Sequence, residues 1–380
     1  MDLLRIATAG SVDDGKSTLI GRLLHDSKSL MADEVEAMDG DFARLTDGLR
    51  AEREQGITID VAHRYFTTPR RRFVLADCPG HARYTRNMVT GASTADLALI
   101  LADAKRGLTD QSRRHAAIAQ LLRVRHVVVA VNKMDLVEWD EDVFDSIVRE
   151  ACELGLGDAT FIPVSALYGD NVVDPSEQAP WYSGPTLLDV LEGVDVWRGH
   201  EDEPVRLPVQ SVIRAGGERR YAGRVSAGVV RPGDEIVVAP GGERTRVLDV
   251  FGPCGERLEA APAGLSVTVT LADDLDVARG ALLVAADGAP EPSRELAADA
   301  CWLAHAPSRP GGTYLLRHGT ATVRVKLLDG SLSLNDLGRV RLRLATPLTT
   351  DPYTQIRATG AFILIDETTN DTVAAGMVGG

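Results

Sequence analysis

The sequence predicts an α/β domain with a mostly parallel sheet and helices on both faces, followed by two small antiparallel β-barrel domains. In the first half, apolar strand-like runs alternate with amphipathic helical segments, which is typical of βα units. After a polar linker the hydrophobic period becomes two, and turn residues separate short strands, as in small barrels. A Pro/Gly-rich break then divides this β region. We therefore expect domains at residues 1–196, 205–287 and 294–380.

The individual elements follow from local hydrophobic patterns. Apolar runs predict strands of the first domain at residues 3–9, 73–76, 126–131 and 161–164. Amphipathic spacing predicts helices at 16–24, 110–123 and 141–154. The β region alternates at 235–239, 266–271, 322–327 and 339–344, between Pro-Gly, Gly-Gly and Asp-Gly turns. Residues 195–204 form the expected linker, and 285–293 form the second break.

The composition bounds the class of protein. The chain has 380 residues, of which 44% are hydrophobic, so it can bury two or three cores. Its formal net charge of −14 argues against nucleic acid or an anionic membrane as a partner. No apolar stretch approaches the roughly 18 residues of a membrane span, and the N-terminus has no signal-peptide pattern. The four cysteines show neither zinc nor disulfide spacing. We expect a cytoplasmic protein.

A glycine-rich loop after the first predicted strand contains the first motif with a chemical function. Residues 10–17 fit G-x-x-x-x-G-K-[ST], the phosphate-binding P-loop. Gly10 and Gly15 allow the backbone to approach phosphates, Lys16 can reach the β- and γ-phosphates, and the Ser17 hydroxyl can ligate Mg²⁺. The strand–loop–helix context disfavours a chance match. The expected phosphate-binding residues here are Gly10, Ser11, Val12, Asp13, Asp14, Gly15, Lys16, Ser17 and Thr18.

A second motif selects the base. Asn132, Lys133 and Asp135 follow an apolar strand, at the end where open α/β sheets bind ligands. The Asp135 carboxylate can accept hydrogen bonds from guanine N1–H and the N2 amine, which adenine does not offer in that geometry. Taken alone, these residues are equally typical of a polar turn. Together with the P-loop they predict GTP, with Ser165 and Ala166 closing over the base through a backbone N–H to guanine O6.

A third motif, at residues 77–81, lies between these two. Asp77 is expected to hold the Mg²⁺ shell through water, and Gly80 to give a backbone N–H to the γ-phosphate. His81 could orient the attacking water, although a plain helix N-terminal residue is the alternative. Thr58 could supply a second hydroxyl to Mg²⁺, or be only a β-branched strand residue. Asp77, Cys78, Pro79 and Gly80 complete the expected phosphate site, His81 is the expected catalytic residue, and the expected metal ligands are Ser17, Thr58 and Asp77.

These motifs, in this order, define a P-loop GTPase domain. The Asp-Cys-Pro-Gly-His and Gly-Ile-Thr-Ile variants resemble the translation-factor branch, the elongation factor Tu class. A narrower resemblance covers nearly the whole chain: several stretches are similar to the large GTP-binding subunit of bacterial sulfate adenylyltransferases. These stretches are residues 10–23, 51–62, 84–96, 181–188, 217–225, 334–340 and 359–367.

The resemblance implies a function and a partner. In that family, GTP hydrolysis drives ATP and sulfate to adenylylsulfate and diphosphate during sulfate assimilation. The chain has no second P-loop, no Ser-Gly-Gly-x-Asp-Ser loop and no His-x-Gly-His motif; residues 317–320 come near the last and are expected to be structural or partner-facing. The resemblance therefore implies that adenylylsulfate is made on a small adenylyltransferase subunit, in a heterodimer or a higher assembly.

Two other functions compete with this one. The chain could deliver an aminoacyl-tRNA as an elongation-factor-like GTPase, or act as a regulatory switch with negligible turnover. The resemblance of the C-terminal stretches disfavours the first, and His81 disfavours the second. One departure from the family lies between Val325 and Leu332, where the chain has a shorter segment than usual. The last barrel, and its partner contacts, could be trimmed there.

Overall fold

The structure is a computed structural model, and it describes residues 2–28, 42, 60–80, 85–196, 201–215 and 217–379. The chain divides into two compact units, Met1–Trp197 and Arg198–Gly380. The first unit is α/β and the second is almost entirely antiparallel β, which confirms the predicted fold class. The exact boundaries of the three predicted domains stay a prediction.

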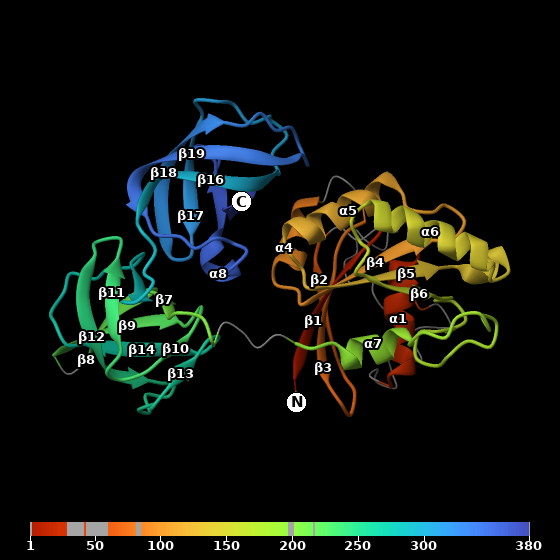
Figure 1. Cartoon of the computed structure of the whole chain (residues 1–380), viewed down its shortest axis with the longest axis horizontal. Coiled ribbons are helices and arrows are strands. Elements are labelled where there is room, and N and C mark those ends of the chain that lie inside the picture. The colour runs from red at the N-terminus through yellow and green to blue at the C-terminus, as the bar shows by residue number, and fades with distance from the viewer. Residues whose placement is uncertain are drawn as a thin grey trace. The chain divides into compact units, whose positions relative to one another are not determined.

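The first unit is built on a six-stranded sheet with the order β2-β3-β1-β4-β5-β6 (Figure 1). Only β2 runs antiparallel to its neighbour. The strands are β1 Leu3–Ala9, β2 Ala62–Thr67, β3 Arg72–Asp77, β4 Leu97–Asp103, β5 His126–Asn132 and β6 Thr160–Pro163. Each parallel strand therefore ends at the same edge of the sheet, and this edge carries the predicted motifs.

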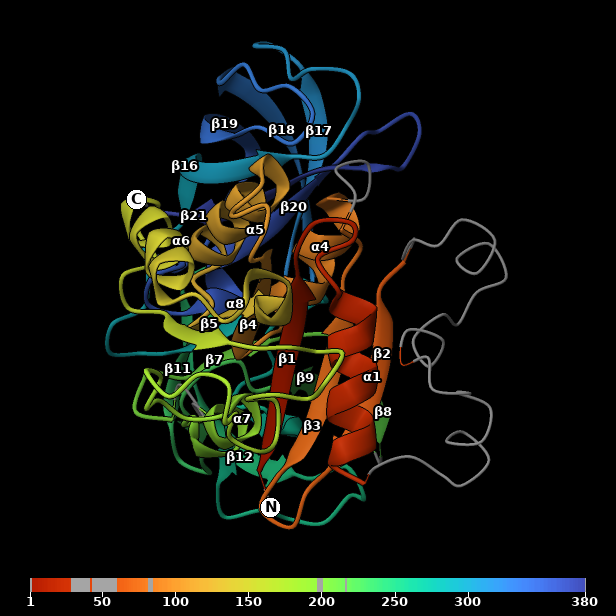
Figure 2. The same ribbon diagram turned by 90° about the vertical axis from the view of Figure 1, so that its right-hand side faces the viewer.

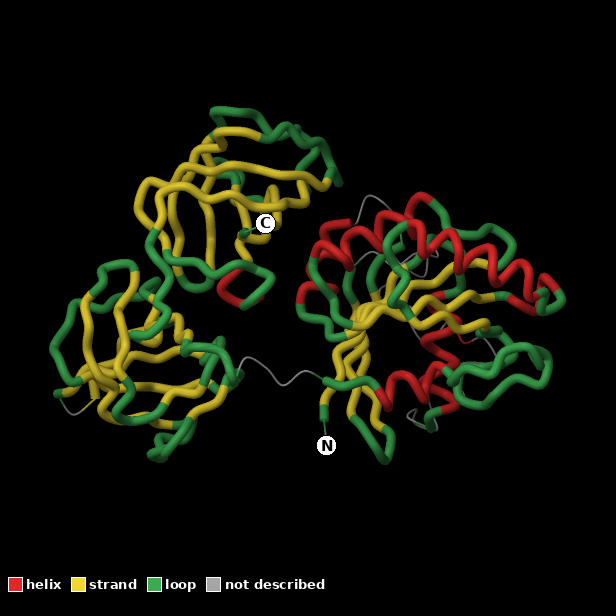
Figure 3. Tube along the Cα trace, viewed as in Figure 1, coloured by secondary structure: helices red, strands yellow, loops and turns green. Residues whose placement is uncertain are grey.

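Helices cover both faces of this sheet (Figure 3). They are α1 Lys16–Asp26, α4 Thr85–Ser93, α5 Asp110–Leu121, α6 Glu141–Glu153 and α7 Leu187–Gly193, with a 3₁₀ turn η3 at Met134–Val137. Helices α1 and α7 lie on one face, and α4, α5 and α6 lie on the other. Because both faces are covered, the central strands are apolar throughout, and all seven residues of β4 are buried.

The second unit begins with a seven-stranded antiparallel sheet of order β7-β15-β11-β12-β14-β9-β8. Its strands are β7 Arg206–Pro208, β8 Ser211–Ala215, β9 Glu218–Arg224, β11 Glu235–Ala239, β12 Glu243–Phe251, β14 Ser266–Leu271 and β15 Leu282–Ala285; β10 Val229–Val230 and β13 Ala261–Pro262 form a separate pair. This sheet differs from the predicted barrel in one respect. In the described part of the chain, its end strands share no continuous ladder. Strand β7 instead meets the segment after β9 at an isolated bridge, where Arg206 N–H donates to the Ala227 carbonyl at 2.9 Å.

The last six strands form a closed barrel of order β16-β19-β18-β17-β20-β21. They are β16 Ser293–Trp302, β17 Thr313–His318, β18 Ala321–Asp329, β19 Leu337–Leu348, β20 Ala361–Ile365 and β21 Thr372–Val378, and a single helical turn, α8 Arg357–Gly360, precedes β20. The shortened segment that we noted between Val325 and Leu332 does not prevent closure. It contributes the end of β18 and the turn after it, and the β18–β19 ladder is retained.

A buried ion pair joins the two β domains. Arg206 on β7 donates from Nε to Asp351 Oδ2 at 2.9 Å and from Nη2 to Asp351 Oδ1 at 2.9 Å. The Thr359 hydroxyl donates to the same carboxylate, and the side chains of Arg206 and Asp351 are 4% and 3% exposed. Because the two charges are paired and hydrogen-bonded, they offset part of the cost of their burial, and removing either partner would leave an uncompensated buried charge.

Candidate nucleotide-binding site

The predicted motifs meet at the carboxyl edge of the first sheet. The P-loop follows β1 and leads into α1, as the red ribbon in Figure 2 shows. Asp77 ends β3, Asn132 ends β5, and Ser165 follows β6. Lys133 adopts a left-handed backbone with φ of 65°, where the chain leaves β5 for η3. The parallel sheet thus brings together residues that are far apart in the sequence.

The P-loop has the shape of a phosphate cradle. Gly15 caps α1 with φ of 89°, and a Cβ atom there would lie 2.4 Å from Asn132 Nδ2, so only glycine fits. The Lys16 side chain runs inward and the residue is only 7% exposed. A Cβ atom on Gly80 would lie 3.0 Å from Lys16 Nζ and 2.8 Å from the Gly10 carbonyl oxygen. Lys16 and Gly80, the two groups expected at the γ-phosphate, are therefore neighbours.

Asp14 points into the protein. The Ser11 N–H donates to its Oδ2 at 2.5 Å, and the residue is fully buried. Burial raises the pKa of the Asp14 carboxyl, while the Ser11 N–H and the Arg106 guanidinium, 3.9 Å from Oδ1, act in the opposite direction. The Asp14 side chain therefore shapes the loop, and only its backbone is available to a phosphate.

Asn132 connects the P-loop to the loop after β6, the two segments expected at the phosphates and the base. Its Nδ2 donates to the Asp14 carbonyl oxygen at 2.8 Å, and its Oδ1 accepts the Ala166 N–H at 2.9 Å. One buried amide thus bonds the P-loop and the loop after β6. Lys133 adds a second tie, because its Nζ donates to the Asp13 carbonyl oxygen and to Asp103 Oδ2 at 2.7 Å.

Asp135 is held by Ser165. The Ser165 hydroxyl donates to Asp135 Oδ1 at 2.7 Å, and Asp135 stays partly exposed. We expected a backbone N–H of Ser165 or Ala166 at guanine O6, and both of these groups make hydrogen bonds within the protein. Ser165 N–H bonds to the Asp170 carbonyl at 3.3 Å and Ala166 N–H to Asn132. The Ser165 hydroxyl instead orients the Asp135 carboxylate, the group that we expect at the base.

The described metal candidates are Ser17 and Asp77. Ser17 lies in the first turn of α1, and Asp77, which is 2% exposed, accepts a hydrogen bond from the Thr8 hydroxyl at 3.0 Å. Within the described part of the chain, no group of three or more His, Cys, Asp or Glu could hold a metal. The residues fit Mg²⁺ nonetheless, because this ion takes one or two protein oxygens and completes its shell with phosphate and water. Thr58 and His81 lie outside the described residues.

Three residues that lie at the site were not among the site residues that we predicted from the sequence. Thr8 orients Asp77, Asp103 pairs with Lys133, and His115 accepts the Gly10 N–H at 3.0 Å. Asp103 ends the apolar strand β4, so its position at a strand end was a usable signal. His115 lies on the buried face of α5, where a polar side chain is unusual.

Cys78 follows Asp77 and is fully buried. Burial raises the pKa of the Cys78 thiol to about 12, and the neighbouring Asp77 charge contributes. The thiol therefore stays neutral at ordinary pH and is a poor nucleophile. Only the backbone N–H of Cys78 could therefore meet a phosphate, and Pro79 has no N–H to donate.

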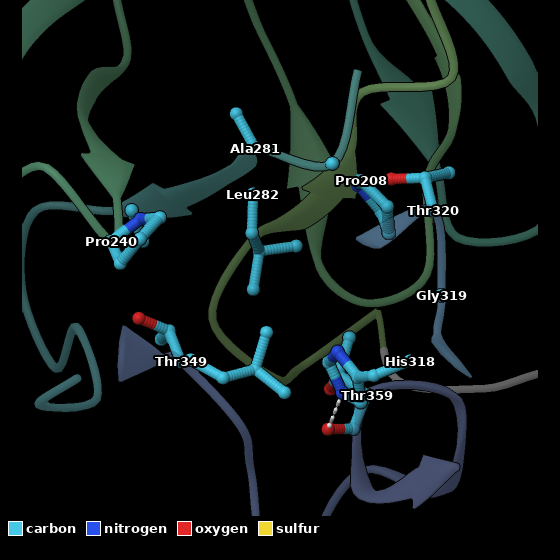
Figure 4. Close-up of a pocket in the computed structure, with 12 residues that line it drawn as sticks. Pro208, Pro240, Ala281, Leu282, His318, Gly319, Thr320, Thr349 and Thr359 are labelled. Atoms are coloured by element: carbon cyan, nitrogen blue, oxygen red, sulfur yellow. Dashed lines mark hydrogen bonds between the residues drawn. The ribbon is translucent and has the colours of Figure 1, made fainter. Parts of the chain in front are cut away.

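A small cavity in the second unit is lined by both β domains (Figure 4). Its volume is about 20 Å³, room for one water molecule. His318 lines it, and its ring nitrogen Nε2 bonds to the Thr359 carbonyl oxygen at 2.7 Å. Burial lowers the pKa of His318, so the ring is neutral and packs between the domains. The 317–320 stretch is therefore structural at His318, as the sequence indicated.

Comparisons with known proteins identify the class. The family described as "Elongation factor Tu GTP binding domain" matches residues 1–196, and "GTP-eEF1A C-terminal domain-like" matches residues 329–379. Fold and site thus define a P-loop GTP-binding protein of the elongation factor Tu class.

Full-length relatives narrow this to one family. "Sulfate adenylyltransferase subunit 1" of Aeromonas salmonicida is 48% identical, with 99% of this chain and 86% of that protein covered. The "Bifunctional enzyme CysN/CysC" of Mycobacterium tuberculosis is 52% identical, with 99% and 67% covered. The chain belongs to the family of sulfate adenylyltransferase subunit 1, and is a GTPase subunit of that enzyme. These relatives favour this function over aminoacyl-tRNA delivery. Among the described residues, no helix is long and apolar enough to cross a membrane.

Proposed function

We propose that the chain binds GTP with Mg²⁺ at the carboxyl edge of its first sheet. Hydrolysis of this GTP drives ATP and sulfate to adenylylsulfate and diphosphate on a separate small adenylyltransferase subunit. The observation that carries the proposal is the Asn132 side chain, which bonds both the P-loop and the loop after β6. Phosphate and base subsites are thereby held at a fixed separation, as one nucleotide requires.

Different residues bind different parts of the nucleotide. Lys16 and the backbone N–H groups of residues 11–18 bind the β- and γ-phosphates, while Asp135, held by Ser165, accepts from guanine. Ser17, Asp77 and Thr58 would hold Mg²⁺. When bound, that ion neutralises charge on the β- and γ-phosphate oxygens during transfer. Burial of Lys16 excludes water around its ammonium group and strengthens its attraction to phosphate.

The partner and the compartment follow from the same proposal. Relatives named subunit 1 imply a second subunit, and we assign the adenylylation chemistry to it, in a heterodimer or higher assembly. We place the protein in the cytoplasm, where ATP and GTP are available. We expect neither a nucleic acid nor a membrane to be its partner. The net charge of −14 supports this exclusion.

Co-expression with the small subunit tests the proposal. We expect the two chains to purify together, and adenylylsulfate to accumulate above the level that ATP and sulfate reach alone only when both chains and GTP are present. Lys16→Ala removes the ammonium group at the phosphates and should abolish GTP-dependent adenylylsulfate formation. Lys105→Ala, at an exposed position two residues after β4, should leave it unchanged. If the chain alone instead protects aminoacyl-tRNA from deacylation in a salt-dependent manner, the elongation-factor function is correct.

Replacing His81 by alanine tests the hydrolytic step. We expect GTP turnover to fall by about 10²-fold or more, because a group that orients the attacking water is lost. The dissociation constants of GTP and GDP should change little, because no contact to the nucleotide is removed. Single-turnover hydrolysis and equilibrium binding measure the two effects separately. An equal loss in binding would make His81 a structural residue.

A further inference from the structure

A buried histidine lies behind the P-loop. His115, on α5, has no exposed surface, and its Nδ1 accepts the Gly10 N–H at 3.0 Å. Its Nε2 lies 2.8 Å from the side-chain amide of Gln111, one turn earlier on α5. Both ring nitrogens therefore contact polar groups, one on the P-loop and one on the helix.

The hydrogen bonds fix the protonation state and the orientation of the ring. Burial lowers the pKa of His115 to about 3, and the Lys16 and Arg114 charges add to this. The ring is thus neutral and carries a single N–H. Because Nδ1 accepts from Gly10, this proton is on Nε2, the ring nitrogen that faces the side-chain amide of Gln111.

Gly10 connects this histidine to the γ-phosphate end of the site. Its N–H is held by His115, while its carbonyl oxygen faces Gly80, where an added Cβ atom would come within 2.8 Å of it. Lys16 Nζ lies on the same side of Gly80, at 3.0 Å from that Cβ position. A shift of Gly10 would therefore change the space available to Gly80, and with it the γ-phosphate subsite.

We propose that His115 is a positioning residue for GTP: it fixes Gly10 against Gly80, and so sets the preference of the site for GTP over GDP. This inference rests on the proposed function, since it assumes that Gly80 meets the γ-phosphate. The contribution of His115 is indirect, through the backbone of Gly10. GDP has no γ-phosphate and depends less on this arrangement.

Variants of His115 separate positioning from plain core packing. His115→Leu keeps the volume and leaves the buried Gly10 N–H without its acceptor. We expect the affinity for GTP to fall by about 10- to 100-fold, the usual cost of such a group, and the affinity for GDP to fall clearly less. His115→Asn should retain the wild-type preference, because asparagine Oδ1 and histidine Nδ1 are separated from Cα by the same bonds. In His115→Gln the acceptor lies one methylene further out, so this variant should lose GTP affinity as the leucine variant does. Because glutamine is polar, it provides the same test if the leucine variant does not fold.

Equilibrium binding of GTP and GDP to the full chain, with thermal unfolding of each variant, decides the question. His318→Leu is the matched control, a buried histidine with a backbone hydrogen bond in the other compact unit. It should lower stability and leave both nucleotide affinities unchanged. Folded leucine and glutamine variants with the wild-type ratio of GTP to GDP affinity would overturn the inference, as would an asparagine variant that fails to restore this ratio. If the wild-type chain itself does not bind GTP, the proposed function is wrong.

Discussion

Replacing Asp135 by asparagine should change the preferred base from guanine to xanthine. In the proposed site the carboxylate accepts from guanine N1–H and the N2 amine, and asparagine keeps only one acceptor oxygen. We expect the affinity for GTP to fall on the order of 10²-fold or more, since each hydrogen bond to a charged group is worth about 1.5–3 kcal/mol. Xanthine carries a carbonyl in place of the N2 amine. The new amide can donate to that carbonyl, so the affinity for xanthosine triphosphate should rise.

The geometry around Asp135 makes this exchange specific. Ser165 donates to Oδ1 at 2.7 Å, and the asparagine oxygen can keep that bond, which turns the new NH₂ group away from Ser165. Binding of GTP, xanthosine triphosphate and ATP to the full chain measures the change. Asp140→Asn is the matched control, because this exposed residue caps α6 and asparagine caps equally well. Tight GTP binding by Asp135→Asn, with no gain for the xanthine nucleotide, would refute the assignment of the base.

Much of the candidate site could be predicted because its chemistry is local in the sequence. A P-loop needs only a strand, eight residues and a helix, and Lys16 and Gly15 are in the positions that the motif requires. Asn132 and Asp135 follow a strand whose apolar character marks it as buried on both faces. Strand ends of a parallel sheet meet at one edge, so residues far apart in the chain could be assigned to one site.

Contacts between distant segments could not be predicted in the same way. The Gly10–His115 and Asn132–Asp14 hydrogen bonds span 105 and 118 residues, and the Arg206–Asp351 pair spans 145. Such pairs depend on the register and crossing of elements, which hydrophobic periodicity does not specify. The same limit explains why the first β domain is an open curled sheet where we predicted a barrel. Alternating strands predict a curled antiparallel sheet, but whether its end strands share a continuous ladder depends on backbone positions that the side-chain pattern leaves open.

The second large effect concerns energy coupling. In the complex with the small subunit, GTP should raise the final level of adenylylsulfate above the level that ATP and sulfate reach alone. A GTP analogue with a β–γ bridge that cannot be hydrolysed should not do so. We expect loss of the γ-phosphate to release Thr58 and His81 from their proposed contacts, and such a two-state element can transfer the energy of hydrolysis to a bound partner. An analogue that is never consumed can change how fast the partner reacts, but leaves the final level of free product unchanged.

The final level of adenylylsulfate, measured with catalytic amounts of the complex and GTP in excess, therefore separates coupling from activation. The Asp135→Asn variant provides an internal control, because xanthosine triphosphate should replace GTP in the same assay. This replacement would show that the consumed nucleotide acts at Asp135 of this chain. If the analogue and GTP give the same final level, GTP is an allosteric ligand, and its hydrolysis contributes no energy to adenylylsulfate. A faster approach to an unchanged level would lead to the same conclusion, because a difference in rate alone requires no transfer of free energy between the two reactions.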